Sequence, residues 1–241
     1  MPRELTQQQL TERSVTKKFR KEIWNTFIEG TQRYRLIEDG DRVAVCLDGG
    51  ANTLLEAKLL QQLKRVSDTA FETVFFAAPA GDRVFVENQA AALGIPLTAT
   101  DAPNANNAAH ALGCNKLTAP ETRTAVVLSA LRDVLYRSRL EAIPPRELLP
   151  DGKTEIIRPL YCVGEDAVRA FVRYNSLDCL SAPEEDRELQ AVRRLAAEQA
   201  KINPLFEHNV FTGLHAVCRD TLPGYIENGE IHSFLDNYDA E

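Results

Sequence analysis

The sequence lacks the residue patterns that most metal and sulfur sites require. Only five cysteines and four histidines occur among its 241 residues. It has no C-x-x-C pair and no H-x-x-x-H spacing, and only His208 and His215 could share a helical face. Because zinc sites and iron–sulfur clusters gather three or four such side chains, we expect neither. The cysteines are expected to be free thiols of a reducing compartment: Cys46, Cys114, Cys162, Cys179 and Cys218.

Long apolar runs and an excess of basic charge are also missing. No stretch approaches the roughly 20 apolar residues that span a bilayer. The start, Met1-Pro2-Arg3-Glu4, lacks the charged-then-apolar order of a signal peptide. We therefore expect a cytoplasmic protein without a membrane partner. The net charge of −7 argues against broad nucleic-acid binding, and we expect no DNA partner.

What is present is an alternation of two kinds of apolar segment. Short apolar runs alternate with segments whose apolar residues recur every three or four positions, a rhythm typical of βαβ units. We predict one α/β domain with a five-stranded, mainly parallel sheet and helices on both faces. The expected strands are 42–47, 72–78, 96–100, 115–118 and 154–157. The expected helices are 13–34, 51–65, 83–93, 108–112, 120–139, 165–174, 184–201 and 204–218, with a frayed start at 1–12, a loop at 143–152 and an irregular acidic tail at 222–241.

The long helix predicted over 13–34 has two further features. Its basic residues either contact RNA phosphates or form a solvated face offset by Glu22 and Glu29; they are Arg13, Lys17, Lys18, Arg20 and Lys21. Its apolar residues, Trp24 among them, spread over more than one face. They predict either a homodimer interface or packing on this chain's own C-terminal helices.

The rest of the chain is organised around the stretch from Arg42 to Leu55. An apolar run ends in Gly49-Gly50 and a helix-forming segment follows. This order predicts a buried strand, a tight turn and a helix N-terminus, where backbone N–H groups commonly bind phosphate.

The same stretch resembles the S-G-G-x-D-S loop of N-type ATP pyrophosphatases, the PP-loop superfamily. It is most similar to the TtcA-like tRNA 2-thiocytidine synthetases. The resemblance runs nearly end to end and includes the segments 37–41, 113–116, 157–161, 201–204 and 232–236, which read I-E-D-G-D, G-C-N-K, I-R-P-L-Y, K-I-N-P and H-S-F-L-D. It implies an adenine nucleotide alpha-hydrolase-like fold and an ancestral ATP-dependent tRNA thiolation with magnesium and an iron–sulfur cluster.

The loop departs from that pattern where phosphate and metal would bind. Asp48 replaces the first serine and Asn52 the aspartate, whereas Gly49, Gly50 and Thr53 keep the turn and a hydroxyl. A carboxylate about 4 Å from a phosphate charge costs on the order of 1 kcal/mol in water and roughly 4 at an effective dielectric near 20. We therefore interpret residues 48–53, Ala51 included, as a vestigial phosphate loop in which Asp48 stands in for the phosphate.

Two later departures remove further chemistry. Thr124 and Ala125 occupy the positions of two family aspartates, and the insert with C-x-x-C is deleted before Gly113. Glu121 is either a relocated metal ligand or an ordinary acidic residue in the first turn of a helix. We expect no catalytic residues, no metal, and loss of ATP, magnesium and the cluster.

Three hypotheses follow for function. The first is a noncatalytic binding or regulatory protein that forms a homodimer or pairs with an active relative. The others are a sulfurtransferase-type enzyme with residual ATP binding in the ancestral cleft, and a tRNA-binding protein. The expected organisation is an N-terminal helical extension (1–36), a PP-loop-like α/β domain (37–180), and C-terminal helices with an acidic tail (181–241).

Overall fold

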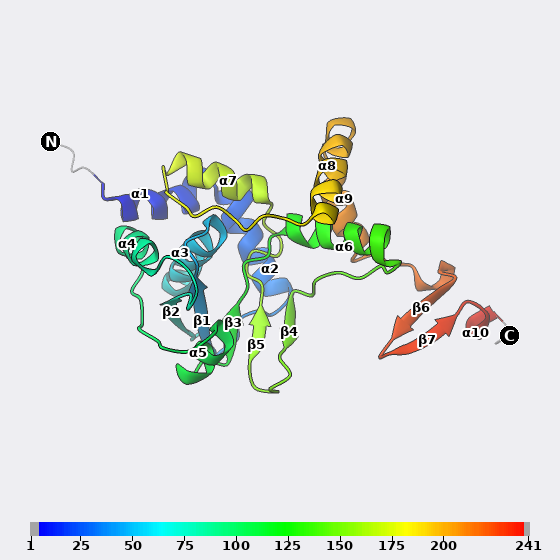
Figure 1. Ribbon diagram of the computed structural model, residues 1–241, viewed down its shortest axis with the longest axis horizontal. Helices are drawn as coiled ribbons and strands as arrows, with labels where there is room; N and C mark the ends of the chain where they lie inside the picture. The colour runs from blue at the N-terminus through cyan, green and yellow to red at the C-terminus, as the bar shows by residue number, and fades with distance from the viewer. Residues whose placement is uncertain (1–4, 239–241) are drawn as a thin grey trace. The chain divides into compact units, whose positions relative to one another are not determined.

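A five-stranded sheet lies at the centre of the first part of the chain (Figure 1). The computed structural model describes residues 5–238. The strand order is β2-β1-β3-β5-β4, and β4 alone runs antiparallel within this sheet. The bounds are β1 Arg42–Leu47, β2 Glu72–Ala77, β3 Lys116–Thr118, β4 Arg146–Leu148 and β5 Glu155–Ile157. The predicted fold class, with the first strand inside the sheet, is confirmed.

Helices cover both faces of this sheet, as the alternation along β1 requires. Val43, Val45 and Leu47 face a core formed with α3, α4, α7 and the N-terminal helices. Ala44 and Cys46 face a smaller core formed with α5. The helices are α1 Gln7–Arg13, α2 Thr26–Arg33, α3 Ala51–Val66, α4 Arg83–Leu93, α5 Ala105–Ala111, α6 Arg123–Arg137 and α7 Glu165–Tyr174.

Two sheet predictions were wrong in detail. The expected strand at 96–100 is reduced to an isolated bridge between Leu97 and Phe75, because Pro96 has no N–H with which to continue a ladder. The fifth strand is instead β4, inside the stretch predicted as a loop. It forms an antiparallel edge, with Arg146 opposite Ile157 and Leu148 opposite Glu155.

The N-terminal segment is longer and less regular than the predicted helix. It begins at Gln7, where Thr6 forms a capping box with Gln9, so the frayed start was wrong for residues 7–12. Residues 1–4 lie outside the described part. Between α1 and α2 the chain forms two π-helical stretches, η1 Ser14–Lys18 and η2 Arg20–Asn25.

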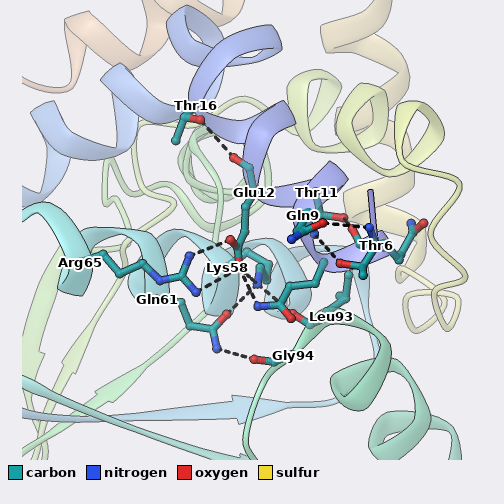
Figure 2. Close-up of polar contacts among 12 residues, drawn as sticks. Thr6, Gln9, Thr11, Glu12, Thr16, Lys58, Gln61, Arg65, Leu93 and Gly94 are labelled. Atoms are coloured by element: carbon teal, nitrogen blue, oxygen red, sulfur yellow. Dashed lines mark hydrogen bonds and ion pairs between the residues drawn. The ribbon is translucent and has the colours of Figure 1, made fainter. Parts of the chain in front are cut away.

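Polar contacts fix the start of this segment to the sheet-covering helices (Figure 2). Glu12 bonds Arg65 at 2.7 Å and Lys58 at 3.1 Å. The ammonium group of Lys58, a side chain 1% exposed, also donates to the carbonyl of Leu93 at 2.8 Å. One carboxylate therefore joins α1 to α3, and through Lys58 to the end of α4.

The chain divides into two compact units, Met1–Arg193 and Arg194–Glu241. The boundaries expected after residues 36 and 180 stay predictions. The second unit contains the end of α8 (Arg187–Ile202), α9 Phe206–Gly213, η3 Arg219–Thr221, β6 Gly224–Glu227, β7 Glu230–Ser233 and α10 Leu235–Tyr238. Within residues 5–238, no helix is both long and apolar enough to cross a membrane.

Part of the tail was wrongly predicted as irregular. β6 and β7 pair antiparallel across a two-residue turn, Asn228-Gly229, with φ values of 51° and 84°. Positive φ at both turn residues is what a tight hairpin of this hand needs, and Asn-Gly provides it. Residues 239–241 of the predicted tail lie outside the described part.

Candidate functional site: the loop between β1 and α3

The structure places residues 48–53 at one junction, where β1 ends and α3 begins at Ala51. Gly49 has a φ of 83°, a backbone conformation that is strained in a residue with a side chain. Gly50, whose backbone is extended, is the N-cap residue of α3. In open parallel sheets this edge, at the carboxyl ends of the strands, is where ligands bind. The loop thus has the backbone of a phosphate site.

Asp48 occupies this turn with its own carboxylate. Its Oδ1 atom accepts hydrogen bonds from the Gly50 amide at 2.8 Å and from the Thr53 hydroxyl at 2.6 Å. Both are donors that a bound phosphate would need. A phosphate entering here would have to displace a bonded carboxylate or lie beside its charge, so the residues present do not fit a nucleotide phosphate.

Asn52 also has a structural task. Its amide Nδ2 donates to the carbonyl of Pro120 at 3.0 Å, which ties α3 to the connection between β3 and α6. An aspartate could not donate this bond. Asn52, which replaces the aspartate expected as a metal ligand, therefore joins the start of α3 to the segment between β3 and α6.

An extended stretch, residues 177–186, covers the loop from outside; we call it the covering segment. The amide of Leu180 donates to the carbonyl of Gly49 at 2.9 Å. A Cβ atom placed on Gly49 would lie 3.0 Å from the Leu180 side chain and 3.2 Å from Phe85. Gly49 is consequently buried, and space above its backbone is already filled.

Charged residues hold the far end of the covering segment. Arg193 donates to both carboxylate oxygens of Glu185 at 3.0 Å and to Glu165 of α7 at 2.7 Å. The hydrogen bonds that Arg193 donates to Glu185 raise the pKa of Arg193 and lower the pKa of Glu185. The segment is therefore fastened at the loop and again near the start of α8.

Glu121 is engaged by a neighbouring cation. Its carboxylate lies 3.2 Å from the guanidinium of Arg158, which is 6% exposed and also bonds the Pro144 carbonyl. The expectation of a helix beginning at 120 was wrong, because α6 begins at Arg123 with Thr122 as its side-chain cap. Glu121 therefore precedes the first turn and pairs with Arg158.

Glu56 is a buried acid that the sequence did not single out. It is fully buried, and within residues 5–238 neither carboxylate oxygen meets a hydrogen-bond donor. Burial raises its pKa to about 8, and the charges of Glu121 and Asp48 add to this rise. The sequence feature that could have indicated its burial is its position between Leu55 and Leu59, on a helix with apolar residues on several sides.

The described cysteines and acids do not form a metal centre. Across residues 5–238, no group of three or more His, Cys, Asp or Glu side chains is arranged to hold a metal ion. Burial raises the pKa of Cys46 to about 12 and of Cys162 to about 11, so both remain thiols at neutral pH. Burial also raises the pKa of Cys114 and Cys179.

The motif residues at the opposite edge of the sheet serve the fold. Lys116, 4% exposed, lies 2.9 Å from Asp41 and 3.2 Å from Glu155, and donates to the Leu36 carbonyl. Asn115 donates to Asp41 at 2.8 Å. These contacts join the amino ends of β1, β3 and β5, far from the ligand edge in the strand direction.

Comparisons with known proteins give related sequences and a related fold, although no family model matches the chain. A tRNA-cytidine(32) 2-sulfurtransferase of Alkalilimnicola ehrlichii is 25% identical over 236 residues, 84% of this chain and 74% of that protein. The Geobacter sulfurreducens protein of the same name is 26% identical over 250 residues, 90% and 96% of the two chains. The U34-tRNA thiolase NcsA from Methanococcus maripaludis, solved with its 4Fe-4S cluster, superposes with a TM-score of 0.59 at 13% identity, over 80% of this chain and 77% of that chain.

Proposed function

Because the chain is a distant homologue of the tRNA-cytidine(32) 2-sulfurtransferases and has the PP-loop fold, we propose that it is a noncatalytic binding protein whose loop no longer takes ATP. The observation that carries the proposal is the carboxylate of Asp48, which holds the Gly50 amide and the Thr53 hydroxyl. With the negative charge already supplied by the chain, the turn needs no ligand to be satisfied.

The retained and the altered motif residues alike have structural tasks. Retained Asp41, Asn115 and Lys116 hold strands together. Thr124, at the position of a family aspartate, accepts a hydrogen bond from the Glu165 amide at the start of α7. Positions that would serve nucleotide or metal thus have structural tasks, which is the pattern expected of a scaffold kept for binding.

The proposed role is regulatory, through a second copy of this chain or an active relative. The apolar residues that suggested a homodimer surface on the N-terminal segment are engaged internally. Phe19 packs edge-on against Phe171 and Tyr174 of α7, and Trp24 is half-buried beside Phe27. These contacts support a partner surface outside this segment, and light scattering at high concentration would decide between self-association and a hetero-partner.

Titration calorimetry with ATP and AMP, with and without Mg²⁺, tests the loss of nucleotide binding. We expect no saturable binding at the loop in the unmodified protein, and millimolar or tighter ATP binding in Asp48→Ser/Asn52→Asp. Asp48→Asn is the matched control, since it removes the negative charge at position 48 but keeps a hydrogen-bond acceptor there. Micromolar, Mg²⁺-dependent ATP binding by the unmodified protein that falls in Thr53→Val would contradict the proposal and favour the enzyme alternative.

A further inference from the structure

A cavity lies away from the Asp48–Thr53 loop, between the N-terminal segment and the end of α7. It has a volume of about 430 Å³. Its lining contains three cationic and no acidic side chains; the residues are Gln7, Leu10, Arg13, Ser14, Lys17, Lys18, Tyr174, Asn175 and Ser176. In a chain with a net charge of −7, a cavity lined only by cations and neutral groups is a distinct chemical environment.

The π-helical turn brings the three cations to this cavity. The Phe19 amide donates to the Ser14 carbonyl at 2.9 Å, five residues back. In a turn of this width, residues four and five apart share one face, so Lys17 and Lys18 both lie on the face of Arg13. Single π turns inside helices are uncommon and often occur at functional sites.

These cations have no ion-pair partner within the described part of the chain. Arg13, Lys17 and Lys18 are exposed and form no ion pair with any residue of 5–238. Glu12, the nearest acid along the chain, is turned the other way, toward Lys58 and Arg65 (Figure 2). The positive charge is therefore available to a ligand.

Hydrogen bonds and a ring contact join the walls of the cavity to one another. The side chain of Asn175, 7% exposed, donates to the Ser14 hydroxyl at 2.9 Å, and Gln7 donates to the Asn175 carbonyl at 2.5 Å. Tyr174 is held by its edge contact with Phe19, and the Lys18 ammonium lies 6.0 Å from the Tyr174 ring. Preorganised walls reduce the ordering cost of binding.

We propose that this cavity binds an oligophosphate, a ligand with two or more linked phosphate groups. Three uncompensated cations around one hollow match a compact polyanion better than a single negative charge. The guanidinium of Arg13 can bond two phosphate oxygens at once, and the two lysines act as point charges. The ligand is either a free inorganic oligophosphate or the phosphate tail of a nucleotide.

Calorimetric titration of the full chain with phosphate, pyrophosphate, tripolyphosphate and ATP at low ionic strength tests this site. We expect 1:1 binding of tripolyphosphate that tightens with phosphate number and weakens as salt is added. Lys17→Ala/Lys18→Ala should weaken it at least tenfold. Arg20→Ala/Lys21→Ala removes two charges from the same segment outside the cavity lining and should change affinity less than threefold.

The test of the cavity is independent of the test of the Asp48–Thr53 loop, because Thr53→Val in the loop should leave tripolyphosphate binding unchanged. If the cavity binds ATP more tightly than tripolyphosphate, its ligand is a nucleotide. If the affinities for ATP and tripolyphosphate are equal, its ligand is the free oligophosphate. The inference is overturned if tripolyphosphate does not bind at millimolar concentration, or if both double variants lose affinity equally. It is also overturned if a short RNA binds through Lys17 and Lys18 while tripolyphosphate does not.

Discussion

The amide of Leu180 donates a 2.9 Å hydrogen bond to the carbonyl oxygen of Gly49, and the Leu180 side chain packs over the same glycine. Gly49 is the residue whose open backbone would let a phosphate approach. Leu180 thus covers Gly49 from outside, while the carboxylate of Asp48 accepts hydrogen bonds from the Gly50 amide and the Thr53 hydroxyl. The proposed loss of nucleotide binding would therefore have two separate causes, the cover over Gly49 and the carboxylate of Asp48, and each can be tested by its own substitution.

Leu180→Pro should loosen the covering segment without changing the loop sequence. It removes the N–H donor to Gly49 and the apolar contact, at a cost of about 1 kcal/mol. Hydrogen exchange at Gly50 and Ala51 is expected to rise about tenfold. Ala182→Pro is the control, because Ala182 is exposed and its amide donates to no described backbone carbonyl. Equal exchange in both variants would show that the contact does not protect the loop.

Glu56→Met should stabilise the protein at pH 8. Burial raises the folded-state pKa of Glu56 to about 8 from an ordinary 4.5, so the folded state holds a proton that the unfolded state releases. This proton binding contributes stability below pH 4.5, and the contribution is lost as pH rises toward 8, by up to about 1.4 kcal/mol per pH unit. Methionine removes this dependence.

Urea denaturation at pH 5 and pH 8 measures the effect of Glu56→Met. The gain should be small or absent at pH 5 and larger at pH 8, whereas Glu188→Met at an exposed position should show no such difference. A gain independent of pH would mean that Glu56 is neutral throughout or ionised throughout. In that case its two unpaired oxygens, and not its titration, would set the cost.

Lys116→Met should destabilise the fold by about 3–5 kcal/mol at neutral pH. The substitution leaves Asp41 and Glu155 together without the buried cation that lies 2.9 Å and 3.2 Å from them. Burial alone would raise the pKa of Asp41, but bonds from the Glu38 amide, Asn115 and Lys116 lower it. Thermal unfolding compares this variant with Lys153→Met at an exposed turn, and a loss similar to that control would refute the structural role.

The element pattern of this fold could be predicted where local chemistry decides it. The strand at 42–47, the helix at 83–93 and the helix at 165–174 match their predictions residue for residue, since each has a clear apolar period and a turn on either side. The dipeptide Asn228-Gly229 is typical of a hairpin turn. The acidic composition of the tail instead led to the prediction of an irregular segment.

The remaining features depend on long-range partners. β4 has three residues and exists because β5 pairs with it, which no local pattern near Pro144 and Pro145 indicates. The sequence identified the Asp48–Thr53 loop and the use of Asp48 in place of a phosphate, but not Leu180, which is 131 positions from Gly49. Glu56 and Lys58 are buried because α3 is covered on several sides by elements distant in sequence.

The final prediction concerns Glu12, whose carboxylate fixes the N-terminal segment. Burial would raise its pKa, but hydrogen bonds from Arg65, Gln8 and Lys58 outweigh burial and lower it to about 2, from an ordinary 4.5. The stability from these bonds is therefore present above pH 4.5 and is lost as pH falls toward 2. Glu12→Gln should destabilise the protein at pH 7 and flatten the fall in stability between pH 5 and 2, measured by urea denaturation. Glu22→Gln, at an exposed site, should keep the parent's pH profile. A parent-like profile in Glu12→Gln would show that the contacts with Lys58 and Arg65 do not contribute to folding.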